Sequence, residues 1–145
     1  MIVNMKIIRN IVGVIAGVLI GSYFNMFIVN LGPTFFPLPA GVNITTEEGL
    51  KAGMSLMQPV HFIAPFLAHA IGTLVATFIA ALIAVSRRKI ITRVISLLYL
   101  VGGAYMVAIL PSPMWFNLLD LIMAYFPMGM LGYTLATKMM PEENV

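Results

Sequence analysis

The 145-residue sequence has no cysteine and very little charge, and each absence excludes a class of protein. Without cysteine the chain can form no disulfide, no thiolate metal site and no cysteine nucleophile. Charged residues make up 9% of the chain and hydrophobic residues 61%, so there is too little polar surface to cover a water-soluble body. The mean hydropathy of +1.02 agrees. The sequence therefore predicts an integral membrane protein.

The motifs of common enzyme classes are missing as well. The sequence contains no Gly-x-Ser-x-Gly nucleophile motif, no His-Glu-x-x-His zinc motif and no phosphate-binding glycine loop. These absences argue against a membrane hydrolase or kinase, and the residues specify no cofactor. The net charge of +3 does not indicate a nucleic-acid partner, because the basic residues flank the apolar segments. The expected partner is the lipid bilayer.

Four apolar segments are long enough to cross a membrane, which takes about 20 helical residues. They cover residues 7–31, 59–85, 90–110 and 114–137, with approximate ends. The predicted fold is all-α, a four-helix transmembrane bundle in which residues 1–145 form a single integral membrane domain. The apolar core of the first segment follows Lys6 and Arg9, but it is longer than the ~7–15-residue core of a signal peptide, and no typical cleavage pattern follows it. We interpret it as a retained helix.

The basic residues predict the orientation of these segments. With four spans, seven basic residues fall on one side and only Lys51 on the other; the seven are Lys6, Arg9, Arg87, Arg88, Lys89, Arg93 and Lys138. Since lysine and arginine are enriched in cytoplasmic loops, both termini are expected in the cytoplasm and residues 32–58 outside. Within that connection, the Thr45-Thr46-Glu47-Glu48 stretch predicts a short extracytoplasmic helix over residues 46–56.

Polar side chains within the spans are the candidate site residues. The helical rise places them at similar depths in the outer half; they are Asn25, His61, His69, Tyr105 and Asp120. Asp120 is the only carboxylate in a span, and an isolated charge there costs about 3 kcal/mol, so it should be paired. His69 is its expected partner by depth, with Asn25 or Tyr105 completing a hydrogen-bonded cluster. Pro65 and Pro127 are expected to interrupt their helices near these residues.

Two interpretations of this cluster remain open. In the first, the protein is structural or accessory, and the polar groups join helices at about 0.6 kcal/mol each. In the second, the cluster lines an outward-facing cavity that binds or transports a proton, a metal cation or a small polar ligand. Membrane redox or quinone chemistry is a weaker third possibility. Met54, Met57 and His61 are spaced like one helical face and are ligand types suited to Cu(I), although methionine more often serves packing.

Small residues form two ridges at helical spacing. Gly13, Gly17 and Gly21 lie four residues apart on one face, and Asn25 continues that face. The second ridge consists of Gly72, Ala76, Ala80 and Ala84. Such ridges let two helices approach closely. The first ridge can meet a helix of the same chain or of another copy, so a homo-oligomer or another membrane-protein partner is possible.

Most of the chain also resembles a group of small bacterial four-span membrane proteins of unknown function. The resemblance rests on Gly21-x-x-x-Asn25-Met26, the loop Pro39-Ala40-Gly41-Val42, the stretch from His61 to Leu74, and Pro113-x-Trp115-Phe116-x-x-x-Asp120. It implies the four-span fold and a location in a bacterial cytoplasmic membrane. It implies no activity.

Overall fold

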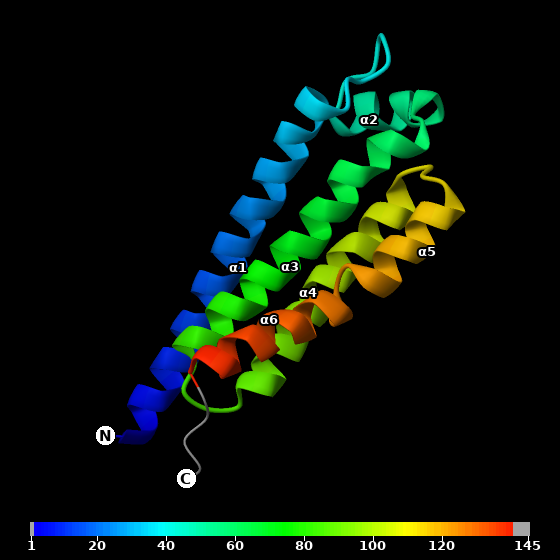
Figure 1. Cartoon of the computed structure of the whole chain (residues 1–145). Helices are drawn as coiled ribbons and strands as arrows, with labels where there is room; N and C mark the ends of the chain where they lie inside the picture. The colour runs from blue at the N-terminus through cyan, green and yellow to red at the C-terminus, as the bar shows by residue number, and fades with distance from the viewer. Residues whose placement is uncertain (1, 141–145) are drawn as a thin grey trace.

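The computed structural model describes residues 2–140, which fold as four long apolar helices and a short helix between the first two (Figure 1). The helices long enough to span a membrane cover Asn4–Phe35, Pro59–Ile83, Arg88–Ile109 and Met114–Met139. Their ends lie within a turn or so of the predicted ones. The all-α four-helix fold is therefore confirmed, and the composition of the helices makes the chain a multi-pass membrane protein.

The first two spans contain α1, Ile2–Phe35, and α3, Ile63–Ile83. The 3₁₀ turn η2, Pro59–Phe62, leads directly into α3. Because of this turn, Pro65 falls in the first turn of α3, where the N–H group that proline lacks would have no helical partner. At 34 residues α1 is about 50 Å long, so it extends well beyond a hydrocarbon core of about 30 Å.

The last two spans differ in continuity. The third is the single helix α4, Arg88–Ile109. The fourth consists of α5, Met114–Met123, and α6, Phe126–Met139, which meet at a bend visible in Figure 1. The break at residues 124–125 lies directly before α6, whose second residue is Pro127. Proline fits the first turn of a helix and disrupts a helix interior, so the expected interruption of this span is confirmed.

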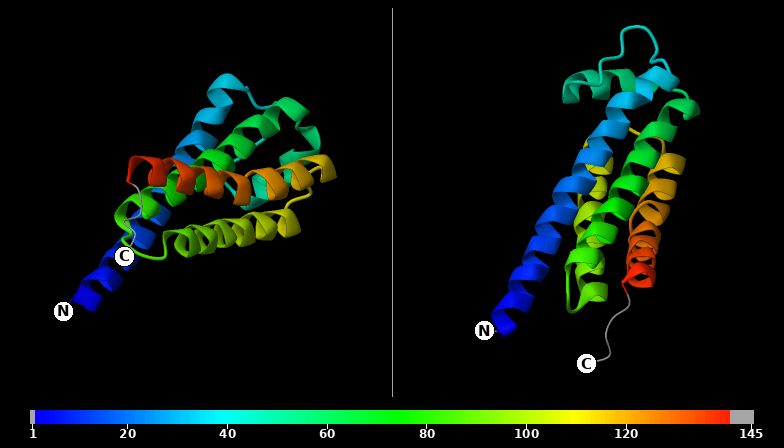
Figure 2. Two further views of the ribbon diagram at one scale, coloured as in Figure 1. Left: turned by 60° about the horizontal axis from the view of Figure 1, so that its bottom comes forward. Right: turned by 60° about the vertical axis from the view of Figure 1, so that its left-hand side comes forward.

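The most extensive helix packing joins α1 to α3 (Figure 2). The two small-residue ridges meet there: a Cβ atom added at Gly17 would lie 2.9 Å from the Cβ of Ala80, and one at Gly13 3.0 Å from the Ala80 carbonyl oxygen. Contacts this close explain why these positions hold glycine. The predicted packing role of Gly13, Gly17 and Gly21 is thus met within one chain. The idea that this ridge joins two copies is corrected, because α3 already covers it.

The two ends of the bundle are built differently, and we name them by their features. The basic end carries the starts of α1 and α4 and the end of α6, while the cavity end carries residues 36–58 and the turn between α4 and α5 (Figures 1 and 2). At the basic end Arg88 is buried and donates hydrogen bonds to the carbonyl oxygens of Ala84 (2.8 Å) and Met140 (2.6 Å). Asn10 of α1 accepts a bond from the backbone N–H of Val85 (3.1 Å) and donates one to Ser86 Oγ (2.9 Å).

The short helix expected at residues 46–56 is present at the cavity end. It consists of α2, Glu47–Gly53, followed by the 3₁₀ turn η1, Met54–Leu56. The N-cap is Thr46, whose hydroxyl accepts a bond from the backbone N–H of Gly49 (3.1 Å). Thr45 instead donates to the side chain of Asn43 (2.7 Å), so the cap lies one residue later than a Thr45–Glu48 capping box would place it.

Candidate functional site

The two residues predicted to pair within the membrane do so. His69 of α3 and Asp120 of α5 face each other, and both carboxylate oxygens lie 2.9 Å from the imidazole Nδ1. The Asp120 side chain is 2% exposed and that of His69 22% exposed. A buried carboxylate needs a partner of this kind, because leaving it alone in an apolar medium costs several kcal/mol. The pair is also partly accessible through the imidazole.

Tyr125 joins this pair, although it was not among the predicted site residues. Its hydroxyl donates to Asp120 Oδ2 (2.9 Å) and lies 3.1 Å from His69 Nδ1, and its ring stacks against the imidazole at 5.8 Å. Residues five apart in a continuous helix are about 140° apart around the axis. The break at residues 124–125 removes that constraint and lets Tyr125 reach Asp120. The closeness of Pro127 to Asp120 was the signal that could have indicated it.

Gly103 of α4 provides the space for this hydroxyl. A Cβ atom built at Gly103 would overlap the Tyr125 hydroxyl oxygen, so only glycine leaves room for it. Three helical elements therefore define the cluster: α3 supplies His69, α5 supplies Asp120, and α4 permits the position of Tyr125. We refer to His69, Asp120 and Tyr125 as the polar triad.

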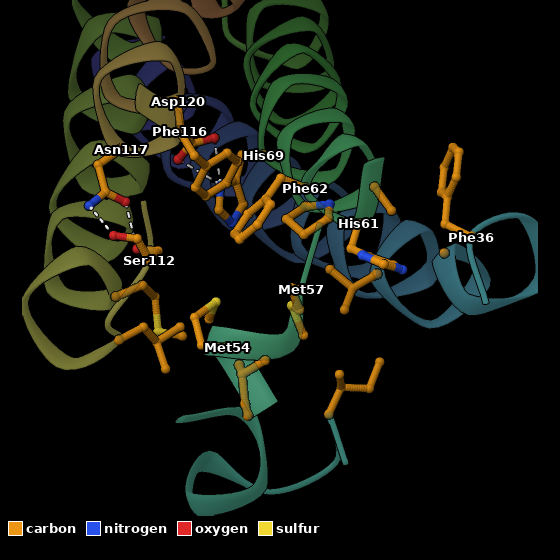
Figure 3. Close-up of a pocket in the computed structure, with 18 of the residues that line it drawn as sticks. Phe36, Met54, Met57, His61, Phe62, His69, Ser112, Phe116, Asn117 and Asp120 are labelled. Carbon is orange, nitrogen blue, oxygen red and sulfur yellow. Dashed lines mark hydrogen bonds and ion pairs between the residues drawn. The ribbon is translucent and has the colours of Figure 1, made fainter. Parts of the chain in front are cut away.

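His69 and Asp120 of the polar triad line a cavity of about 190 Å³ at the cavity end of the bundle (Figure 3). Residues of α1, of the 36–58 connection and of α3, α4 and α5 line it. Its walls are mostly apolar and include Val29, Phe36, Leu50, Phe62, Val107 and Phe116. His69 and Asp120 are among the few polar groups that border it. An apolar cavity with a few convergent polar groups is the usual form of a small-molecule site.

The other polar residues of the cavity are already paired. Ser112 Oγ donates to Asn117 Oδ1 (2.6 Å), and Asn117 Nδ2 donates to the Ser112 carbonyl oxygen (3.3 Å). These two bonds tie the turn before α5 to its first helical turns. Figure 3 shows the pair on the opposite side of the cavity from His61.

His61 lines the cavity but holds the chain together there rather than joining the triad. Its Nδ1 accepts a bond from the backbone N–H of Gln58 (2.8 Å), so its Nε2 carries the hydrogen and donates to the Pro37 carbonyl oxygen (3.1 Å). The imidazole thus caps η2 and fastens the connection that follows α1. Both ring nitrogens are used in these bonds.

The three residues considered for copper have other contacts in the structure. Met54 is 6% exposed and packs with Phe62 and Phe116, and Met57 packs against the same cluster. His61 has no free ring nitrogen. Within residues 2–140 there is also no group of three or more His, Asp or Glu side chains placed to hold a metal ion. Packing accounts for the two methionines.

Asn25 and Tyr105 lie at the expected depth but not in the triad. Asn25 is half-buried in the α1–α3 contact, where a Cβ atom at Gly72 would lie 2.9 Å from its own Cβ. Tyr105 is 61% exposed on the outer surface of α4. The other tyrosine of α4 is the half-buried Tyr99, which donates to the Val18 carbonyl oxygen (3.1 Å) and connects α4 to α1. The expectation that Asn25 or Tyr105 completes the cluster is corrected, because Tyr125 does so.

No family model matches this sequence, and comparison with curated proteins and with solved structures found no similar chain. The resemblance to small bacterial membrane proteins therefore identifies no family. What the structure does support is the coarser statement that the chain is a four-span membrane protein with a buried His69–Asp120 pair.

Proposed function

We propose that the protein binds a small molecule in the cavity beside the polar triad, as a membrane binding protein or carrier. The observation that carries this proposal is the position of the His69–Asp120 pair at the wall of a 190 Å³ cavity. Polar groups that serve only to join helices are expected inside tight packing. Here one side of the pair is packed against Tyr125 and another borders open space.

The accessible atom of the site is His69 Nε2. The Nδ1 atom is engaged by Asp120, and within residues 2–140 Nε2 has no hydrogen-bond partner. Every fully buried side-chain nitrogen or oxygen in the same part of the chain has a hydrogen-bond partner. Because Nε2 has none, Nε2 is not fully buried. His69 is among the residues that line the cavity, and we propose that a ligand there contacts Nε2. Asp120 orients the imidazole for such a contact.

We further propose that the cavity opens to the extracytoplasmic side. Seven of the eight lysines and arginines belong to the basic end, and the eighth, Lys51, lies on α2 at the cavity end. Lys51 is bonded to Glu47 (2.6 Å), and this hydrogen bond raises the pKa of Lys51. Glu47 therefore offsets the charge of Lys51. The remaining positive charge is concentrated at the basic end, so we assign the basic end to the cytoplasmic side.

Binding can be tested with small aromatic probes that match the cavity in size. Benzyl alcohol and benzylamine should bind the purified protein saturably in isothermal titration. Val107→Phe fills the cavity from α4, while Val94→Phe adds the same ring to an exposed position of the same helix. We expect binding to be lost in V107F and retained in V94F. Failure of both probes to bind the wild-type protein, or equal binding by the two variants, would contradict the proposal.

Orientation can be tested separately because the chain has no cysteine. Ser112→Cys places a thiol at the cavity end and Ser86→Cys places one at the basic end. In intact cells a membrane-impermeant maleimide should label S112C and leave S86C unlabelled until the membrane is opened. The reverse pattern would place the cavity in the cytoplasm.

A further inference from the structure

The charge of the cavity restricts the ligands that suit it. Among the described residues that line it, the ionisable side chains are Asp120, His69 and His61, and none is a lysine or arginine. His61 has both nitrogens bonded to backbone groups, with Nδ1 accepting, so it is held as the neutral imidazole. The charge beside the cavity is therefore decided by Asp120 and His69 together.

The hydrogen bonds of the triad define the form of His69 that accompanies an ionised Asp120. Both oxygens of Asp120 lie 2.9 Å from Nδ1, and the oxygens of a carboxylate only accept, so with Asp120 ionised Nδ1 carries a hydrogen. Tyr125 donates its own hydrogen to Asp120. The remaining atom, Nε2, then has two states: with a lone pair the pair carries one negative charge, and with a proton the pair is neutral.

A negative charge in an apolar wall needs a counter-charge. A proton on Nε2 supplies one, and so does a cationic ligand that donates an N–H to the Nε2 lone pair. The proton and the cationic ligand cannot be bound at the same time, because both use the same lone pair. Resting on the function proposed above, we infer that the ligand is a small organic ammonium ion that competes with a proton for His69 Nε2.

The rest of the cavity suits the apolar part of such an ion. Phe36, Phe62 and Phe116 are among its lining residues, and aromatic rings attract a cation placed over their faces. An anionic ligand would meet the Asp120 charge instead. A neutral alcohol of the same shape could occupy the walls, but it would leave that charge without a partner.

Among the described residues that line the cavity beside the triad, none is a lysine, arginine or glutamate. Asp120 comes from α5 and Tyr125 from the junction with α6, while α1 and α4 border the cavity with uncharged residues such as Val29, Met106 and Val107. On η2 the only ionisable residue is His61. The competition between proton and ammonium ion is therefore assigned to His69.

Four probes that share a benzyl or phenyl group test this inference on the wild-type protein: benzylamine, benzyltrimethylammonium, benzyl alcohol and benzoate. Benzylamine, which is a cation at neutral and acidic pH, should bind about tenfold more tightly than benzyl alcohol, since its hydrogen bond is charge-assisted. Benzyltrimethylammonium has no N–H and should bind more weakly than benzylamine, and benzoate should bind least.

Lowering the pH should weaken benzylamine binding, because a proton then occupies Nε2. Titrations in buffers of different ionisation enthalpy should show proton release on binding, with the proton passing to solvent. His69→Gln should remove this release while the protein still folds. Tyr105→Phe changes an exposed side chain outside the cavity, so it should leave the release unchanged.

The outcomes separate this inference from the proposed function. If benzyl alcohol binds as tightly as benzylamine, the cavity is a site but the ammonium class is overturned. Equal binding of benzyltrimethylammonium, or no proton release, overturns the competition at Nε2. If none of the four probes binds, the proposed function falls together with the inference.

Discussion

The two ends of this bundle differ in the size of their contact residues and in the use of their polar groups. Towards the basic end, glycine and alanine bring α1 against α3, and buried Arg88 bonds to two backbone carbonyl oxygens. At the cavity end, phenylalanine, methionine and proline residues surround open space, and one imidazole nitrogen is without a partner within residues 2–140. Small residues permit close packing, whereas large and rigid ones separate the helices.

The two halves of the bundle are therefore expected to serve different roles, one in stability and the other in binding. The packed half is where stability is expected to reside, because its backbone contacts tolerate no added atoms. The cavity half carries a buried carboxylate that packing alone would not require. Substitutions in the two halves should therefore affect different measurements.

The largest expected effect is on binding, from Asp120→Asn in the cavity half. The amide keeps the size of the side chain and still accepts a bond from His69, but it removes the negative charge that balances an ammonium ion. We expect benzylamine binding to weaken about 100-fold or more, which corresponds to about 2.7 kcal/mol. The free energy of unfolding should fall by only about 1 kcal/mol. A large loss of stability with unchanged binding to the remaining folded protein would favour a purely structural triad.

The next effect is on stability, from Gly17→Leu in the packed half. The first added atom would lie 2.9 Å from the Cβ of Ala80, so α1 and α3 must separate. Overpacking of this kind costs about 1–3 kcal/mol, measured as the free energy of unfolding in detergent. Gly102→Leu is the matched control, because Gly102 is exposed and nothing lies within 4 Å of an added Cβ. Similar losses in both variants would show that the ridge is not a tight contact.

The smallest effect expected is from Tyr125→Phe, which removes one hydrogen bond to Asp120. It should lower the free energy of unfolding by about 1 kcal/mol. Tyr105→Phe is the control: the exposed hydroxyl of Tyr105 is outside the triad, so this change should have no measurable effect. An equal effect of the two substitutions would show that the Tyr125 hydroxyl does not stabilise the triad.

The sequence was sufficient to predict features that depend on position along a helix. Hydropathy located the four spans, residue spacing identified both small-residue ridges, and depth alone paired His69 with Asp120. The depth of a residue in the membrane follows from counting residues at a fixed rise per residue, so it can be predicted without knowing how the helices pack.

Features that depend on rotation about a helix axis could not be predicted in this way. Tyr105 was predicted from its depth, yet it faces outwards, and Tyr125 contacts Asp120 in its place. The outcome depends on the break before Pro127 and on the space left by Gly103. The bonds of His61 likewise depend on where residues 36–58 fold back. Such choices are set by packing between segments distant in the sequence.

The most direct test of the central claim is to observe the imidazole of His69 while a ligand binds. The chain has only two histidines, so ¹⁵N-labelled histidine gives few signals, and His61→Gln assigns them. On addition of benzylamine, we predict that the Nε2 resonance of His69 shifts with the same saturation as binding, while the signals of His61 stay in place. Saturable binding with no change at His69 would show that the polar triad is not the ligand site.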